Sequence, residues 1–327
     1  MRRHSHRRIL SFGLVLILVL VMIFSGLRIL ESTVFYNGSV IEETHVSKTI
    51  TRDGVAYFPR QDITVIMALG IDEKGPVVSS GDYRNNGEAD AIFLIILDQV
   101  DETYSVLCLN RDTMLEIPVI GLGGKKAGTY YGQLALSHTY GEGLEDSCEN
   151  SRETISNFLY GITIDHYIAM NMDAISILND AVGGVTVNVV DDFSKVDPRI
   201  TKGEHTLMGS EALSFVQTRK DLGDQLNISR MVRHREYMQG FMKAFVEKVE
   251  SSDTFVLKLH DKVSEYVVTD CSATVISGIM DRCADYSLKE IVSVEGDNVL
   301  GEEYYEFYPN EEKLDELILR LFYAPKH

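Results

Sequence analysis

The chain has 327 residues, and its formal net charge at neutral pH is −18. The first 30 residues contain five arginines and no acidic residue, so the rest of the chain carries a formal charge of −23. Because affinity for nucleic acids comes largely from Lys and Arg that neutralise phosphates, such an acidic surface excludes a nucleic-acid-binding role. Nearly 300 residues can bury a large core, and we expect one large domain.

The N-terminal segment predicts a membrane anchor. Residues 9–27 contain no charged side chain, and at about 1.5 Å per residue a helix over this run reaches close to the ~30 Å of a hydrocarbon core. Four arginines precede the run, which predicts a cytoplasmic tail at residues 1–8 and export of everything after the helix. No small-x-small cleavage site follows the run, which favours a retained anchor over a signal peptide. We therefore expect a single-pass protein of the cell membrane whose C-terminal domain is extracellular.

The chain after the anchor predicts an irregular, polar extracellular stalk at residues 28–60 and one α/β domain at residues 61–327. Short apolar runs predict strands, and amphipathic stretches between them predict helices, so the two alternate as in layered α/β proteins. The expected strands are residues 63–69, 91–97, 104–109, 166–170 and 185–190. The expected helices are residues 151–160, 173–181, 210–218, 228–250 and 314–322, and Asn150 and Glu153 are expected to form a capping box.

The four cysteines are Cys108, Cys148, Cys271 and Cys283. A helix expected over residues 272–282 would hold the last two about 18 Å apart, too far for a disulfide. Cys108 lies inside an apolar strand and is expected to be a buried thiol.

Arginines occur at three places that suit a phosphate site. Arg111 directly follows an expected central strand, Arg219 ends an expected helix, and Arg230 and Arg233 share one turn with His234. A guanidinium group makes forked contacts to phosphoryl oxygens, so the arginines favour a phosphate or pyrophosphate ligand. The alternative is that each arginine pairs with a local acid, as Arg111 can with Asp112, and this alternative stays open.

Two aspartates, Asp72 and Asp90, lie at the ends of adjacent expected strands. Two carboxylates at one sheet edge can hold Mg²⁺ between protein and phosphate oxygens. The spacing alone is weak support for a metal site, because aspartates are common at strand ends.

The order of these segments resembles the LytR-CpsA-Psr family of cell-wall glycopolymer ligases. Besides the anchor, the matching segments are 69–72 (LGID), 89–92 (ADAI), 106–113 (VLCLNRDT), 164–167 (IDHY), 181–185 (AVGGV), 203–213 and 229–233 (SRMVR). The resemblance implies a three-layer α/β/α sandwich with a central mixed sheet. It also implies transfer of an anionic glycopolymer such as teichoic acid from a polyprenyl-pyrophosphate carrier to peptidoglycan, assisted by Mg²⁺ or Mn²⁺.

The resemblance also assigns roles to residues. It implies that Arg111, Asp90 and Arg230 are catalytic and that Asp72 and Asp90 hold the metal ion. The residues that it implies for substrate binding are Arg111, Gln217, Arg219, Arg230, Arg233 and His234.

Four positions depart from the family pattern. Glu88 and Gln217 stand where the family has arginines, Asn227 stands in place of an aspartate, and His234 replaces a glutamine. Two fewer arginines predict weaker or more metal-dependent pyrophosphate binding, and Glu88 is expected to repel phosphate. The alternatives to a transferase are therefore a noncatalytic binder of polyprenyl-phosphate lipids and a polyprenyl pyrophosphate hydrolase.

Overall fold

The structure is a computed structural model. It describes residues 49–325 except residues 53, 122–123, 219–221, 223–226, 253–254, 272–274, 276–277, 280–281, 284–285 and 303, and it describes only the backbone of residues 227–231, 246, 249–250, 256–257 and 260–261. The expected cytoplasmic tail, the membrane anchor and the first part of the stalk lie outside the described residues, as does most of the helix expected over residues 272–282. Within the described ranges, no helix is long and apolar enough to span a bilayer.

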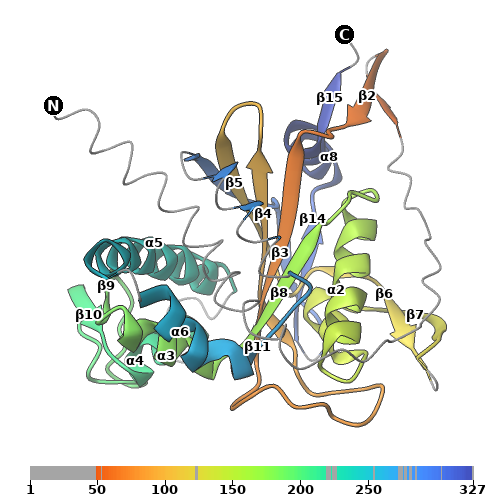
Figure 1. Ribbon diagram of the computed structural model, residues 1–327. Helices are drawn as coiled ribbons and strands as arrows, with labels where there is room; N and C mark the ends of the chain where they lie inside the picture. The colour runs from red at the N-terminus through yellow and green to blue at the C-terminus, as the bar shows by residue number, and fades with distance from the viewer. Residues whose placement is uncertain are drawn as a thin grey trace, which may run out of the picture.

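A six-stranded mixed sheet lies at the centre of the domain, in the order β11-β8-β3-β4-β5-β12 (Figure 1). The strands are β3 (Ile63–Ile71), β4 (Ala89–Asp98), β5 (Thr103–Leu109), β8 (His166–Asn171), β11 (Val267–Thr269) and β12 (Ser287–Ser293). Strands β3, β4 and β5 pair antiparallel, whereas β8 runs parallel to β3 and β12 parallel to β5. The expected central strands and the mixed sheet are confirmed.

Among the described elements, four helices and a hairpin cover one face of the sheet (Figure 1). These are α3 (Asp173–Ala181), α4 (Ser210–Gln217), α5 (Asn227–Ser251), α6 (Phe255–Val263) and the hairpin β9 (Val185–Val189) to β10 (Gly203–Leu207). Ile66, Ile95 and Val106 point to this face and pack with Phe215 and Phe245. The helices therefore bury their apolar stripes against alternate residues of the strands.

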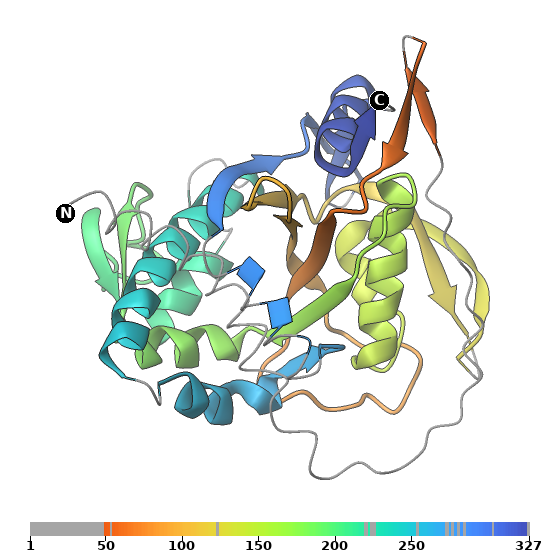
Figure 2. The same cartoon turned by 45° about the horizontal axis from the view of Figure 1, so that its top comes forward.

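The opposite face packs against α2 (Glu145–Phe158), the 3₁₀ segment η2 (Leu134–Thr139), α8 (Glu311–Phe322) and the hairpin β6 (Met114–Ile120) to β7 (Lys126–Gln133). Figure 2 shows the sheet between α2 and the helices of the first face. Val65, Met67, Leu94 and Leu107 fill this second core. Because both faces are buried, the central strands are apolar along most of their length.

Part of the expected stalk is folded. The strands β1 (Ile50–Arg52), β2 (Val55–Pro59) and β15 (Tyr323–Pro325) form a small antiparallel sheet. The remaining elements of the described residues are η3 (Ser264–Tyr266) and the hairpin β13 (Gly296–Leu300) to β14 (Tyr305–Pro309). The prediction of irregular structure is therefore wrong for β1 and β2. The partner strand comes from the other end of the sequence, so local pattern could not reveal it.

Helix α2 begins six residues before its predicted start, and no capping box forms. The Asp146 carboxylate accepts hydrogen bonds from the amides of Glu142 and Ser147 and orders the turn that precedes the helix. Asn150 instead donates to the Ser137 carbonyl at 2.8 Å, deep in the second core. The predicted cap is therefore a buried mid-helix contact. All four cysteines are buried free thiols, as predicted for Cys108.

Candidate functional site

Arg111 lies in a rigid turn that directly follows β5. The Asn110 carbonyl accepts hydrogen bonds from the amide and hydroxyl of Thr113, at 3.1 and 2.6 Å, and its side chain accepts from the Asp112 amide at 3.0 Å. The Arg111 carbonyl accepts from Ala135 of η2 at 3.0 Å. An Asn-centred turn of this kind fixes the backbone, so the guanidinium group projects from a well-defined position.

Three carboxylates surround the Arg111 guanidinium. Glu88 Oε2 lies 2.6 Å from Nη2, Asp112 Oδ1 lies 3.3 Å from Nε, and Asp90 contacts Nη1. The Arg111 side chain is 7% exposed, whereas that of Glu88 is 38% exposed. The alternative of local pairing with Asp112 is thus correct in part, but the two nearest carboxylates, those of Glu88 and Asp90, come from the segment where β4 begins. A phosphate that reaches Arg111 has to share it with these carboxylates.

A β-bulge places Asp90 at this site. Gly70 pairs with Ala91, whereas Ile71 pairs with Ala89, so Asp90 is the additional residue on β4. Such a bulge redirects a side chain at the end of a ladder. On the neighbouring strand, the Asp72 amide donates to the Glu88 carbonyl at 2.9 Å. The structure therefore brings Asp72 and Asp90 to the same end of the sheet, where β3 ends and β4 begins, as predicted.

Helix α4 ends at this edge. Gln217, its last residue, donates a side-chain hydrogen bond to Asp72 Oδ1 at 2.9 Å. The residue that replaces a family arginine is therefore in contact with the predicted metal carboxylate. Arg219, two residues further on, lies outside the described residues, and Arg230 is described only as part of the first turn of α5.

Arg233 and His234 hold α4 against α5. The Arg233 guanidinium donates to the Phe215 carbonyl at 2.9 Å and to the Thr218 carbonyl, and it pairs with Asp191 at 2.7 Å. His234 donates from Nε2 to the Val216 carbonyl at 2.9 Å. Arg233 is 4% exposed, so in this structure it fixes the end of α4 and presents no open phosphate contact.

An apolar cavity of about 190 Å³ lies between the sheet and α5. Its α5 wall consists of His234, Tyr237, Met238 and Phe241, which recur at helical spacing. The sheet side includes Ala68, Gly70, Ala91, Phe93, Ile95, Val106, Ile168 and Met170. Burial raises the pKa of Tyr237. The sequence predicted the helix of α5, but it did not predict that one face of this helix lines a cavity.

A second, polar cavity of about 520 Å³ lies beside the loop that leads to Glu88. Lys74, Arg84, Asn85 and His138 are among its lining residues. The His138 imidazole donates from Nδ1 to the Gly87 carbonyl at 2.9 Å, and burial lowers its pKa to about 4. A neutral His138 therefore fixes the residue next to Glu88, a contact that the sequence did not suggest.

The site thus combines a buried arginine, several carboxylates and an adjoining apolar cavity in an α/β domain with a central mixed sheet. The chain belongs to the LytR_cpsA_psr family, whose model matches residues 29–321.

Three relatives illustrate the likeness. The chain is 26% identical over 321 residues to the polyisoprenyl-teichoic acid–peptidoglycan teichoic acid transferase TagU of Oceanobacillus iheyensis, an alignment that covers 93% of this chain and 91% of TagU. The structure of protein gbs0355 of Streptococcus agalactiae has a TM-score of 0.64 at 20% identity, with 80% of this chain and 86% of that chain covered. TagV of B. subtilis has a TM-score of 0.58 at 23% identity, with coverages of 80% and 96%. The two structures establish the fold.

Proposed function

We propose that this protein is a membrane-anchored phosphotransferase that attaches an anionic glycopolymer of the teichoic acid class from a polyprenyl-pyrophosphate carrier to peptidoglycan. One observation carries the proposal: Gly70 and Ala91 line the apolar cavity. Asp72 lies two residues after Gly70, and Asp90 directly precedes Ala91, so both carboxylates lie next to the cavity wall. A lipid chain in the cavity would place its pyrophosphate beside these carboxylates and Arg111. The name of the TagU relative supports the same reaction.

The cavity suits an isoprenoid chain. Its walls are almost entirely aliphatic, aromatic or thioether side chains, which match a hydrocarbon ligand because burial of apolar surface drives binding. The adaptable side chains Met170, Met172 and Met238 on its walls can adjust to a long, irregular ligand. The α/β/α layers implied by the family resemblance would then enclose the lipid on the α5 face.

The donor set of the site fits a hard divalent cation such as Mg²⁺ or Mn²⁺. Among the described residues, Asp72 and Asp90 do not belong to a group of three or more His, Cys, Asp or Glu side chains whose ligand atoms lie close together. Such a pair suits Mg²⁺, because Mg²⁺ typically uses one or two carboxylates together with phosphate and water oxygens. Three carboxylates around a single guanidinium leave excess negative charge. When bound at Asp72 and Asp90, the metal ion would neutralise phosphoryl oxygens.

The protein groups would bind and orient the substrate in this account. Arg111 would donate hydrogen bonds to phosphoryl oxygens, and Arg219 and Arg230 would supply further positive charge. Gln217 would act through its bond to Asp72, and Arg233 and His234 through the position of α4. This is phosphoryl transfer by positioning and charge neutralisation. The polar cavity beside Gly87 would take sugar hydroxyls of the peptidoglycan acceptor.

A second candidate function is noncatalytic binding of polyprenyl-phosphate lipids. It is favoured by the contacts of Glu88 with Arg111 and of Gln217 with Asp72, which occupy two groups that the reaction needs. The two functions predict the same lipid site but differ in turnover.

The decisive experiment is transfer of a labelled glycan from a synthetic polyprenyl pyrophosphate to a peptidoglycan oligomer by the full-length protein in detergent, with and without Mg²⁺. The proposal predicts metal-dependent transfer. Tight lipid binding without turnover would contradict it in favour of the binder, and release of free glycan phosphate without transfer would indicate a hydrolase.

A further inference from the structure

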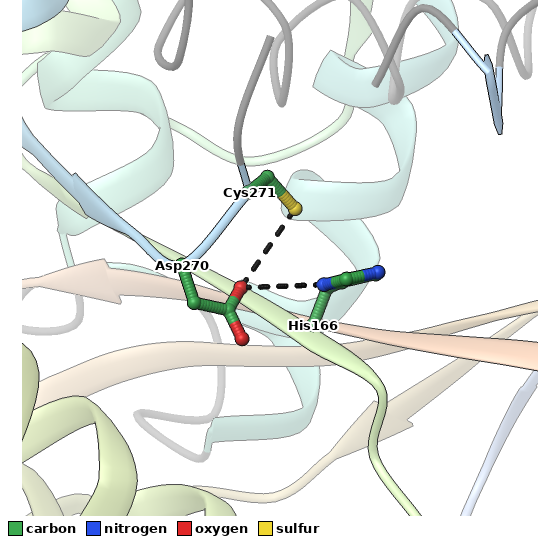
Figure 3. A group of neighbouring side chains, drawn as sticks. All are labelled: His166, Asp270 and Cys271. Atoms are coloured by element: carbon green, nitrogen blue, oxygen red, sulfur yellow. Dashed lines mark hydrogen bonds and ion pairs between the residues drawn. The ribbon is translucent and has the colours of Figure 1, made fainter. Parts of the chain in front are cut away.

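Three side chains with metal-ligand chemistry meet where β8 begins and β11 ends. His166 is the first residue of β8, and Asp270 and Cys271 directly follow β11 (Figure 3). Among the described residues they form a group whose three ligand atoms all lie within 4.8 Å of one another. His166 pairs with Ile66 of β3, six positions before Asp72, so this cluster is about 20 Å from the phosphate site at about 3.3 Å per strand residue.

Two distances in the cluster, both to Asp270 Oδ1, lie close to those of a tetrahedral zinc site. His166 Nδ1 lies 3.6 Å from Asp270 Oδ1, and Cys271 Sγ lies 3.7 Å from the same oxygen. Tetrahedral bonds of about 2.0–2.1 Å to nitrogen and oxygen and about 2.3 Å to sulfur separate such pairs by about 3.4 and about 3.6 Å. After small side-chain shifts, one metal ion could bond both to Asp270 Oδ1 and to either His166 Nδ1 or Cys271 Sγ.

Neighbouring groups orient the ligands. The Tyr167 amide donates to Asp270 Oδ1 at 3.0 Å, and Arg152 donates to the other oxygen, Oδ2, at 3.3 Å. Thr269 accepts from the Cys271 amide at 3.1 Å and donates to the Tyr167 carbonyl at 2.6 Å. Outer contacts of this kind hold ligands in place and raise metal affinity.

The local charge also suits a divalent cation. Arg152 pairs with Glu149 as well as with Asp270, so these three groups together with a Cys271 thiolate carry a net charge of about −2, because ligand thiols bind as thiolates. Imidazole and thiolate are ligands of zinc and other borderline transition metals, and Mg²⁺ disfavours both.

We propose that His166, Asp270 and Cys271 bind one Zn²⁺ ion or a similar divalent transition metal, with water as the fourth ligand. The ion would join the edge strand β11 and the segment after it to β8. It would be a second metal site with ligand chemistry different from that of Asp72 and Asp90.

The test uses the full-length protein in detergent, stripped of metal with a chelator and titrated with Zn²⁺ in competition with a chromophoric indicator. We expect one Zn²⁺ per chain, and Co²⁺ substitution should give the near-ultraviolet absorption of a thiolate-to-cobalt transition. Cys271→Ser should abolish that absorption, and Cys271→Ser and His166→Ala should each lower Zn²⁺ affinity by at least about tenfold. The matched controls are Cys283→Ser, at another buried thiol, and His205→Ala, at a histidine that pairs with Glu211.

Two results would overturn the proposal. One is a wild-type protein that binds no stoichiometric Zn²⁺ and shows no thiolate absorption with Co²⁺, which would leave the cluster as an ion pair. The other is unchanged affinity in both ligand variants, which would mean adventitious binding elsewhere. The wild-type cobalt spectrum decides even where a variant fails to fold.

Discussion

The Glu88 carboxylate lies 2.6 Å from a terminal nitrogen of Arg111. In the proposed site, Glu88 would therefore lower phosphate affinity in two ways, by its own charge and by occupying the Arg111 guanidinium group. The sequence predicts a repulsion between Glu88 and phosphate. It does not predict the direct ion pair, because 23 positions separate the two residues and only the fold of the loop before β4 brings them together.

Glu88→Gln should strengthen binding of polyprenyl pyrophosphate. The change removes one negative charge and weakens a competing, partly exposed ion pair, whose net worth is about 1 kcal/mol, so affinity should rise by about three- to tenfold. Binding of a fluorescent polyprenyl pyrophosphate at fixed Mg²⁺ measures the effect. The matched control is Glu153→Gln, which removes an ion pair with Lys126 elsewhere and should leave affinity unchanged. Equal affinities in wild type and Glu88→Gln would mean that Glu88 does not compete with the ligand.

Ala68→Phe should reduce binding of long polyprenyl lipids. Ala68 lines the apolar cavity of about 190 Å³, and an added phenyl ring would fill much of it at a stability cost of about 1–3 kcal/mol. We expect at least a tenfold loss for the lipid pyrophosphate and little change for inorganic pyrophosphate, which needs no cavity. Titration with both ligands separates the two effects. Equal losses for both ligands would place the lipid chain elsewhere.

Arg233→Ala should destabilise the domain. The change leaves Asp191 and the carbonyls of Phe215 and Thr218 without their guanidinium partner. Since Asp191 is partly exposed, we expect a loss of about 2–3 kcal/mol in the free energy of unfolding, measured with urea. Arg320→Ala removes an exposed pair with Glu290 and should cost less than about 1 kcal/mol. Similar losses in both variants would contradict a positioning role for Arg233.

Acid should destabilise the loop before β4 through His138. Burial lowers the pKa of His138 to about 4, from an ordinary value of 6.5, so between these values the unfolded chain binds a proton that the folded chain does not. The contribution of His138 to the free energy of unfolding should therefore be fully present above pH 6.5. It should fall as the pH approaches 4, by up to about 1.4 kcal/mol per pH unit. Urea unfolding at pH 7 and pH 5 measures the slope. His138→Asn keeps a donor for the Gly87 carbonyl and should flatten the slope, and an unchanged slope would assign the acid sensitivity to other groups.

Much of the fold could be predicted because strong local patterns define it. The apolar runs of β3, β4 and β5 and the periodicity of α3 and α5 specify those elements directly. The parts of the fold that the sequence did not predict depend on distant partners. Strand β2 pairs with β15 from the other end of the chain, and Asn150 donates to the Ser137 carbonyl and does not cap a helix. No local pattern encodes such contacts.

In the candidate site, too, local sequence patterns predicted some features, whereas contacts between distant residues could not be predicted. Strand ends place Arg111, Asp72 and Asp90 at one edge of the sheet, as the sequence predicted. The bond from Gln217 to Asp72 joins residues 145 positions apart, and Arg233 is buried by the packing of α4 on α5, so neither arrangement could be read from spacing.

The proposed site is tested most sharply by the binding of a polyprenyl pyrophosphate to wild type, Arg111→Ala and Arg111→Lys, with and without Mg²⁺. Arg111→Ala should lower affinity by about ten- to a hundredfold, and Arg111→Lys should recover only part of it because lysine lacks the forked geometry. Arg199→Ala, at an exposed arginine that pairs with Asp197, should bind like wild type. Wild-type affinity in a folded Arg111→Ala protein, or binding that ignores Mg²⁺, would contradict the proposed site.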